Sequence, residues 1–403
     1  MAWIARFIPL VLALVAAPAA QAASARATVA ALDADMRLAG KASGALVIDL
    51  DSGEELYSLR ADGKRLPASV EKLYTTSTAL LRFGDDGRLA TRALAGQPPD
   101  EAGVLDGDLY LHGGGDPTFD AADAVRLADR LADTGLKRVT GAVVGDESAF
   151  DDRRGPPSSN FRTSSYVGPL SALSFNRGRT GLRAPWFQSD PARFAAEAFE
   201  RALRREGIKI GDSARDGAAP ATAVALAEFP SPAMADLARL TNVPSDNYLA
   251  EILVKALGMQ FAQAGSTAAG TKVVRTTLAP MGLRPNVVDG SGLSRANRTS
   301  PRQVVGLLQH MRREETVQAA AFRDSLAVAG KTGTLRRRMR GTSAAGRCRA
   351  KTGTLNSVSA LAGYCDTTRG GHVAFAFLMN SVGATGARQI QDRMTVELAR
   401  YSP

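Results

Sequence analysis

Residues 67–84 read PASVEKLYTTSTALLRFG. After the proline, apolar and small side chains recur at the i, i+3, i+4 and i+7 spacing of one helical face, at Val70, Leu73, Tyr74, Ser77, Leu80 and Leu81. The spacing predicts a buried helix that ends at Gly84 and has Ser69 in its first turn. Ser69 and Lys72 are three residues apart, so on a helix the hydroxyl and the amine share one face.

The pair Ser69 and Lys72 has the geometry of a serine nucleophile with a lysine base. The same spacing is expected by chance in a chain of 403 residues, and it then means two solvated side chains. The position in the first turn of a buried helix favours the catalytic interpretation.

Two tripeptides carry further functional side chains. Ser245-Asp246-Asn247 begins a predicted helix at 245–258, where Ser and Asp are also favoured as helix caps. Lys351-Thr352-Gly353 lies on a predicted strand at 344–354, and alone it is equally typical of an edge strand with an exposed lysine. In this order, Ser-x-x-Lys, Ser-Asp-Asn and Lys-Thr-Gly are the motif set of active-site-serine β-lactamases and penicillin-binding proteins.

The remaining chain predicts a mixed α/β (α+β) fold. Strands at 45–50 and 56–59 form a hairpin around a glycine-containing turn. Residues 93–227 have short alternating runs, which predict a strand-rich inserted domain. The other expected elements are strands at 107–112, 139–144, 345–353, 357–365 and 372–380 and helices near 121–134, 301–313 and 385–400.

Four longer stretches join the three motifs in resembling one family, the class C low-molecular-mass penicillin-binding proteins, or S13 D-alanyl-D-alanine carboxypeptidases/endopeptidases. These stretches are LYLHGGGDPT (109–118), SALSFNR (171–177), DGSGLSR (289–295) and GRCRAKTGTL (346–355). The resemblance implies a penicillin-binding-protein/β-lactamase-like serine transpeptidase domain, with an antiparallel sheet flanked by helices.

The resemblance also implies a domain organisation. Residues 23–92 and 228–403 would form the catalytic domain, and residues 93–227 would be inserted after the nucleophile helix. The insert is shorter than is usual in the family, which predicts that one of its two usual subdomains is reduced.

A second Lys-Thr-Gly stands at residues 331–333. The corresponding family stretch reads Ala-Gly-x-Asp-Gly-Thr-Leu, which matches residues 329–335 with Thr332 in place of the aspartate. We therefore interpret this tripeptide as a chance copy in a loop. Gly330-Lys331-Thr332 also resembles the end of a phosphate-binding loop, but Ser325 stands where that motif needs glycine, which excludes nucleotide binding.

The resemblance implies a mechanism with an acyl-enzyme. Ser69 attacks the carbonyl of the penultimate D-alanine while Lys72 takes its proton, and water later hydrolyses the ester. Ser245 relays a proton to the departing D-alanine nitrogen. Asn247 orients Lys72 or hydrogen-bonds the substrate amide.

Substrate binding follows from the same resemblance. Lys351 and Thr352 bind the terminal carboxylate, and Gly353 lets the substrate approach the strand. The backbone N–H groups of Ser69 and Thr354 form the oxyanion hole.

A weaker resemblance concerns the pocket for the dibasic side chain of the peptide. Asp146 and Phe150 in the inserted domain and Arg295 after it match family residues near that pocket. A strand end and a surface charge are equally good explanations of these residues.

The N-terminus resembles an export signal. Arg6 is the only charge among residues 1–22, an apolar run of about 11 residues follows it, and Ala20-Gln21-Ala22 fits the cleavage rule. An uncleaved membrane anchor is the alternative, but the run is short of the roughly 20 residues that span a bilayer. We therefore expect cleavage before Ala23 and an exported, periplasmic protein that is soluble or loosely membrane-associated.

The charge balance is basic, with 50 Lys and Arg against 40 Asp and Glu and a net charge of +10. In an exported protein this charge favours cell wall or membrane surfaces over nucleic acid. The densest run, at residues 336–340, has no interleaved aromatic side chains for base stacking, so we interpret it as a solvated basic turn.

The cysteine and histidine counts limit metal chemistry. Two cysteines and three histidines exclude a Cys/His zinc framework, and we expect no metal and no cofactor. A turn between Asn356 and Ser357 would place Cys348 opposite Cys365 in a hairpin, within disulfide range. A disulfide and two free buried cysteines both remain open.

The expected ligands are peptidoglycan pentapeptides or cross-linked peptides, with β-lactams as covalent inhibitors. Two other functions stay open, namely a serine β-lactamase and an inactive cell-wall-binding scaffold. A homodimer is also possible.

Overall fold

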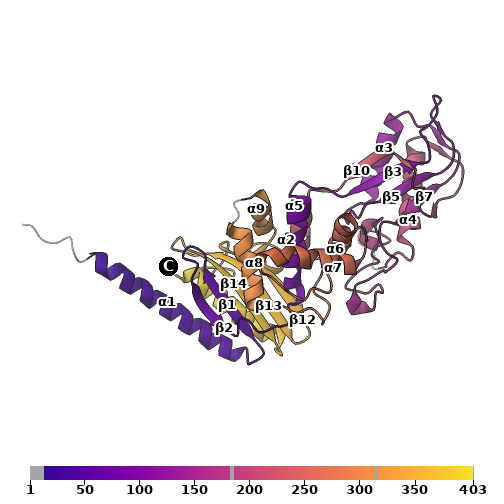
Figure 1. Cartoon of the computed structure of the whole chain (residues 1–403). Coiled ribbons are helices and arrows are strands. Elements are labelled where there is room, and N and C mark those ends of the chain that lie inside the picture. The colour runs from indigo at the N-terminus through magenta and orange to yellow at the C-terminus, as the bar shows by residue number, and fades with distance from the viewer. Residues whose placement is uncertain (1–12, 182–185, 314–315, 403) are drawn as a thin grey trace, which may run out of the picture. The chain divides into compact units, whose positions relative to one another are not determined.

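The computed structural model describes residues 13–181, 186–313 and 316–402, whose elements are labelled in Figure 1. The chain divides into two compact units. The first unit comprises residues 1–65, 300–309 and 327–403, and the second comprises residues 66–299 and 310–326. Helix α8 (Pro301–Arg313) has residues in both.

The first unit contains a six-stranded antiparallel sheet in the order β11-β12-β13-β14-β1-β2. The strands are β1 (Gly44–Asp49), β2 (Glu55–Leu59), β11 (Ala327–Val328), β12 (Cys348–Leu355), β13 (Val358–Asp366) and β14 (His372–Asn380). β1 pairs with β14, so the N-terminal hairpin extends the sheet that the C-terminal strands begin. The predicted hairpin and C-terminal strands are confirmed.

Helices cover both faces of this sheet. On one face α1 (Ala13–Leu38) and α10 (Ala384–Arg400) enclose a core that includes Leu32, Phe375 and Met394. Successive strand residues face opposite sides, so Tyr364 of β13 faces away from this core, and its hydroxyl donates to the carbonyl of Leu308 in α8 at 2.7 Å. The predicted antiparallel sheet flanked by helices is confirmed.

The hairpin of β12 and β13 settles the question of the cysteines. Cys348 lies directly opposite Cys365, and the two form a disulfide. The two-residue turn at Asn356 and Ser357 produces this register, since Leu355 pairs with Val358. Of the two alternatives, the disulfide is confirmed.

The second unit contains a group of helices around the nucleophile helix. α2 (Lys72–Phe83) follows the 3-10 turn η1 (Ala68–Glu71) and ends before Gly84, as predicted. α2 packs against α5 (Met234–Asn242), α6 (Asn247–Ala262), α7 (Thr267–Leu278) and α9 (Val317–Asp324). A short 3-10 turn, η4 (Ala279–Met281), follows α7.

Two further sheets lie in the same unit. A mixed sheet has the order β10-β3-β5-β7-β9, and a parallel one has the order β4-β6-β8. Their strands are β3 (Ala90–Ala95), β4 (Val104–Leu105), β5 (Leu109–Gly113), β6 (Arg138–Val139), β7 (Val143–Asp146), β8 (Lys209–Ile210), β9 (Arg215–Asp216) and β10 (Val224–Pro230). The intervening helices are α3 (Ala121–Asp133), η2 (Pro157–Ser159), η3 (Asn176–Gly178) and α4 (Pro191–Arg205).

These sheets share a hydrophobic core of their own with α3 and α4, made from residues between Ala93 and Ala214. β3 pairs with β10, so the chain enters and leaves this region on neighbouring strands. The exact limits of 93–227 as an inserted domain stay a prediction.

The single strand predicted at 139–144 is wrong. β6 and β7 belong to different sheets, and residues 140–142 cross between them. The backbone passes close to Asp108 at this crossing, because a Cβ at Gly141 would lie 2.5 Å from an oxygen of Asp108. The alternation of apolar residues does not reveal such a change of sheet.

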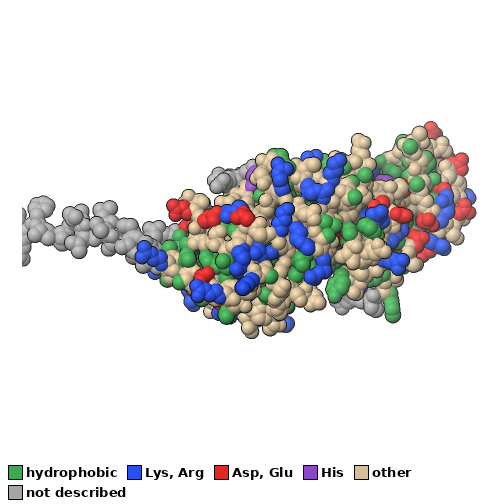
Figure 2. All heavy atoms as spheres, turned by 60° about the horizontal axis from the view of Figure 1, so that its bottom comes forward, with side chains coloured by type: hydrophobic (Ala, Val, Ile, Leu, Met, Phe, Trp, Pro, Cys, Tyr) green, Lys and Arg blue, Asp and Glu red, His purple; other side chains and the backbone are tan. Residues whose placement is uncertain are grey.

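At the surface, Figure 2 shows Lys and Arg side chains spread over the visible face among other residues. The basic run at 336–340 lies in turns, and Arg336, Arg337 and Arg340 are exposed, as predicted. Among the described residues, no helix is long and apolar enough to cross a membrane. Residues 1–12 of the predicted signal lie outside the described residues, and residues 13–22 belong to α1.

Candidate active site

The nucleophile Ser69 lies in the 3-10 turn that precedes α2. Ala68 has a φ of 48°, a left-handed conformation that a residue with a Cβ rarely adopts. Gly292 packs against this turn, since a Cβ at Gly292 would lie 2.0 Å from the carbonyl oxygen of Ala68. Backbone strain is therefore concentrated beside the nucleophile, and a glycine from a distant segment permits the close approach.

Lys72 is fully buried, and its Nζ atom has three hydrogen-bond partners. It lies 2.9 Å from the Oγ of Ser69, 2.8 Å from the Oδ1 of Asn247 and 2.6 Å from the carbonyl oxygen of Ser291. The structure thus brings together the predicted residues Ser69, Lys72 and Asn247 around one amine.

The chemistry of these partners orients the amine. A carbonyl oxygen can only accept hydrogen bonds, so the oxygens of Asn247 and Ser291 each take one N–H of Lys72. When Lys72 is neutral, its two N–H bonds are used there and its lone pair is left facing the Ser69 hydroxyl. This arrangement suits a general base that removes the Ser69 proton.

Glu71, Glu251 and Asp289 place buried carboxyl groups near Lys72. Glu251 is one helical turn after Asn247 on α6 and accepts the backbone N–H of Ser291 at 2.9 Å. Asp289 accepts from the backbone N–H groups of Gly292 and Ser294 and from the Asn297 amide. These contacts hold the Ser291 carbonyl in place for Lys72.

Burial shifts the pKa values of this cluster. It lowers the pKa of Lys72 to about 8, although the nearby carboxyl groups, led by Asp289, favour the charged amine. Burial, reinforced by Asp289, raises the pKa of Glu251 to about 8 and that of Glu71 well above its usual range. Both carboxyl oxygens of Glu71 lack a hydrogen-bond partner among the described residues. Because the pKa of Lys72 is about 8, a substantial fraction of Lys72 is neutral near pH 8.

Asp246 and Asn247 take the two roles that their tripeptide suggests. Asp246 is the N-cap of α6 and accepts the backbone N–H of Leu249 at 3.0 Å, so the capping interpretation holds for this residue. Ser245 precedes the cap in a left-handed conformation, with a φ of 64°. Asn247 begins the helix and directs its Oδ1 to Lys72. One tripeptide therefore caps the helix and places Asn247 against Lys72, while the proton relay through Ser245 stays a prediction.

Lys351, Thr352, Gly353 and Thr354 lie on β12 in the first unit. Among the described strands, β11 pairs with β12 at Arg349 and Ala350, just before this motif. Lys351 is buried, and its Nζ donates to the Thr352 carbonyl at 2.8 Å. The predicted strand position of the motif is confirmed.

The second Lys-Thr-Gly lies in a turn after β11, as predicted, and Lys331 is exposed. Its Thr332 hydroxyl accepts the backbone N–H of Val328 at 2.8 Å. The following Thr334 hydroxyl contacts the Thr352 hydroxyl at 2.9 Å. The second Lys-Thr-Gly is therefore part of a turn next to β12 and not part of a strand.

Comparisons with known proteins agree with this geometry. The profile of the D-Ala-D-Ala carboxypeptidase 3 (S13) family matches residues 25–186 and 182–401. The chain belongs to the S13 family. It is 30% identical over 472 aligned residues to a D-alanyl-D-alanine carboxypeptidase of an Actinomadura species, covering 97% of this chain and 87% of that protein.

Solved structures confirm the fold of this S13 protein. Penicillin-binding protein 4 of Haemophilus influenzae matches with a TM-score of 0.79 and 22% identity, over 92% of this chain and 99% of that one. A predatory endopeptidase of Bdellovibrio bacteriovorus, acylated with penicillin G and bound to an immunity protein, matches with a TM-score of 0.52 and 18% identity, covering 88% of each chain. The penicillin-binding-protein fold is therefore shown.

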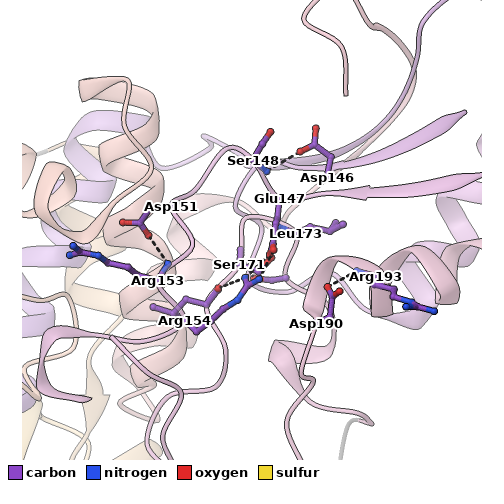
Figure 3. A network of polar contacts seen from close by, with 12 residues as sticks. Asp146, Glu147, Ser148, Asp151, Arg153, Arg154, Ser171, Leu173, Asp190 and Arg193 are labelled. Atoms are coloured by element: carbon purple, nitrogen blue, oxygen red, sulfur yellow. Dashed lines mark hydrogen bonds and ion pairs between the residues drawn. The ribbon is translucent and has the colours of Figure 1, made fainter. Parts of the chain in front are cut away.

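The structure gives the contacts of the residues predicted for the dibasic pocket. Asp146 is buried, with Nδ1 of His112 at 2.8 Å, and accepts the backbone N–H groups of Ser148 and Ala219. Burial raises its pKa, but these hydrogen bonds outweigh burial and hold the pKa below its usual range. Figure 3 shows Asp146 and Ser148 beside the ion pair of Arg154 with Glu147.

Phe150 is also buried, with the Nζ of Lys255 at 5.6 Å from its ring centroid, whereas Arg295 is exposed. The contacts of Asp146 and Phe150 explain the presence of both residues by their contribution to the stability of the fold. Their binding role, like that of Arg295, stays a prediction.

Sequence reasoning missed the Ser291 carbonyl and the Glu251 and Asp289 carboxyl groups. The stretch DGSGLSR attracted attention only as a family resemblance, and a backbone carbonyl has no sequence signature. The position of Glu251, four residues after Asn247 on a predicted helix, was an available signal.

Proposed function

We propose that the protein is a serine D-alanyl-D-alanine carboxypeptidase and D,D-endopeptidase that acts on peptidoglycan peptides. The observation that carries this proposal is the contact of Lys72 Nζ with Ser69 Oγ at 2.9 Å, with two acceptor-only oxygens on the other sides of the amine. The activity named for the Actinomadura relative supports the same conclusion.

In the first step, Ser69 Oγ forms a bond to the carbonyl carbon of the penultimate D-alanine, and its proton passes to Lys72. The C–N bond to the last D-alanine then breaks, and the departing nitrogen receives a proton from Lys72 by way of Ser245. The product is an ester on Ser69, which water hydrolyses.

Binding of the leaving group is assigned to the motif on β12. Lys351 and Thr352 bind the terminal carboxylate, while the N–H groups of Ser69 and Thr354 stabilise the oxyanion. Gly353 leaves room for the substrate backbone. These assignments rest on the order of the motifs in an S13 chain.

The same nucleophile accounts for inhibition by β-lactams, which acylate the active-site serine. The Bdellovibrio endopeptidase acylated with penicillin G supports this part of the proposal. We further propose that residues 1–22 direct export to the periplasm and are then removed. A homodimer stays a prediction.

Purified peptidoglycan tests the balance of the two activities. Wild-type protein should release free D-alanine from pentapeptides or cleave the cross-links between peptides, whereas Ser69→Ala should do neither. An inactive cell-wall scaffold would bind the same material without releasing either product.

The lifetime of the acyl-enzyme separates this function from that of a β-lactamase. A penicillin-binding protein keeps the penicilloyl ester for a long time, whereas a β-lactamase hydrolyses it quickly and turns over. Rapid turnover of benzylpenicillin would contradict the proposal.

A further inference from the structure

Residues 289–292 bring a backbone carbonyl to Lys72, although they lie outside the three motifs. This loop packs closely against α6, because a Cβ at Gly290 would lie 2.4 Å from the carbonyl oxygen of Ala250. Gly292, with a φ of 84°, also packs closely against the turn that carries the nucleophile. The loop is therefore held between α6 and the nucleophile turn, and its carbonyl reaches the amine from a fixed position.

Two buried side chains hold the peptide group between Gly290 and Ser291. Its carbonyl oxygen accepts from the Thr75 hydroxyl at 2.9 Å, and its N–H donates to Glu251 Oε1 at 2.9 Å. Thr75 lies on α2, and Glu251 lies on α6, one helical turn after Asn247. Because both polar atoms of this buried peptide group are paired with side chains, turning the group would leave both of them without a partner.

The next peptide group of the loop is fixed as well. Its N–H, on Gly292, donates to Asp289 Oδ1 at 2.8 Å. Its carbonyl oxygen, on Ser291, accepts from Lys72 Nζ at 2.6 Å. Three of the four polar atoms in these two peptide groups are thus bound by side chains that are not in the motifs, and the fourth contacts the lysine.

The direction of the Ser291 carbonyl determines how the amine of Lys72 is used. A neutral amine has two N–H bonds and one lone pair. When Asn247 Oδ1 and the Ser291 carbonyl each accept one N–H, the lone pair faces Ser69 Oγ. If the Ser291 carbonyl turned away, the second N–H would donate to Ser69 Oγ instead. The amine could then not accept the proton of the Ser69 hydroxyl.

We propose that Glu251 and Thr75 are positioning residues for the acylation step. They fix the Ser291 carbonyl, and this carbonyl aims the lone pair of Lys72 at the nucleophile. Both side chains are fully buried, so they act through the loop and not by contact with the substrate. In the step that they serve, the Ser69 proton passes to Lys72 as the bond from Oγ to the carbonyl carbon forms. The proposal rests on the proposed function and adds two residues to it.

Two replacements of Glu251 test this role. Glu251→Gln keeps an oxygen that accepts the Ser291 N–H, whereas Glu251→Leu has a similar size and no acceptor. Acylation by benzylpenicillin is measured over a range of concentrations, which separates the rate constant at saturation from the apparent dissociation constant. The rate constant should fall about 100-fold in Glu251→Leu, because the base is misplaced, and should stay close to the wild-type value in Glu251→Gln. The dissociation constant should not change in either variant.

Thr75→Val tests the other side of the same peptide group and keeps the size of the side chain. It should lower the same rate constant about fivefold, which is the effect expected for one hydrogen bond, without changing the dissociation constant. Thr78→Val is the matched control. Thr78 is buried on the same helix, and its hydroxyl has no hydrogen-bond partner among the described residues, so this variant should be acylated at the wild-type rate.

Thermal unfolding shows which variants fold. A folded Glu251→Leu protein that is acylated at the wild-type rate would overturn the proposal, and so would an equal loss in Glu251→Gln. If Glu251→Leu does not fold, Thr75→Val decides, because a rate equal to that of Thr78→Val also overturns the proposal. Wild-type protein that benzylpenicillin does not acylate would refute the proposed function itself, and the positioning role with it.

Discussion

At the scale of single residues, the amine of Lys72 decides the chemistry. With its pKa lowered to about 8 by burial, Lys72 loses its proton between pH 7 and pH 9. A base acts only in its neutral form, so the rate of acylation of Ser69 should rise with pH and reach half of its plateau near pH 8. Stopped-flow measurement with a chromogenic β-lactam between pH 6 and 10 gives this profile.

Lys72→Arg tests whether Lys72 is a base or only a positive charge. Guanidinium stays protonated throughout this pH range, so acylation should fall by about 10³-fold and lose its rise with pH. Ser69→Ala is the reference for complete loss. A rate in Lys72→Arg comparable to that of wild type would mean that another group removes the Ser69 proton.

Glu251 makes a prediction about stability. Its pKa is raised from 4.5 to about 8 in the folded protein, so between these values the folded state holds a proton that the unfolded state has lost. This group therefore lowers the free energy of unfolding as pH rises from about 5 to 8. Glu251→Gln keeps an acceptor for the Ser291 N–H and removes the titration.

We expect urea unfolding at pH 5 and pH 8 to show a smaller loss of stability in Glu251→Gln than in wild type, by about 3 kcal/mol. Glu101→Gln is the control, because Glu101 is an exposed acid in a turn of the second unit. An equal pH dependence in wild type and Glu251→Gln would mean that Glu251 titrates as it does in the unfolded chain.

At the scale of elements, β12 and the turn after β11 carry the same tripeptide with different expected roles. Lys351→Ala should reduce acylation by benzylpenicillin about 100-fold or more, since it removes the cation assigned to the substrate carboxylate. Lys331→Ala is the natural control, because Lys331 is exposed in a turn, and it should acylate at nearly the wild-type rate. The reverse result would assign the site to the wrong copy.

The hairpin of β12 and β13 carries a second prediction at this scale. The disulfide joins residues 17 positions apart, and a closed loop of this length stabilises a fold by about 3 kcal/mol. Replacing both Cys348 and Cys365 by alanine should lower the free energy of unfolding by that order, measured in urea without reductant. An unchanged unfolding midpoint would show that the bridge does not constrain the chain.

At the scale of the whole molecule, elements with a clear period were predictable. The pattern from Val70 to Leu81 gave the nucleophile helix, and the two-residue turn at Asn356 and Ser357 gave the cysteine register. The split of 139–144 between two sheets was not predictable, because pairing partners lie far apart in the chain. The contact of the Ser291 carbonyl with Lys72 was not predictable for a related reason, because it depends on a distant segment that packs against α2.

The order of the motifs that is typical of the S13 family predicts the active site, which the local sequence patterns alone do not predict. The three motifs occur at separations of more than 100 residues, and each alone has an ordinary structural explanation. Their joint order predicted the site, and the contacts of Lys72 with Ser69 and Asn247 confirm that two of the motifs meet. The roles of Lys351 and its neighbours stay a prediction.

The central claim is that Ser69 becomes acylated with Lys72 as its base. Intact-mass spectrometry after incubation with benzylpenicillin, followed by peptide mapping, tests it most directly. The account predicts one penicilloyl adduct per chain, located on Ser69, absent from Ser69→Ala and slowed by a peptide that ends in D-Ala-D-Ala. A wild-type protein that gains no mass, or a Ser69→Ala protein that gains the same adduct, would contradict it.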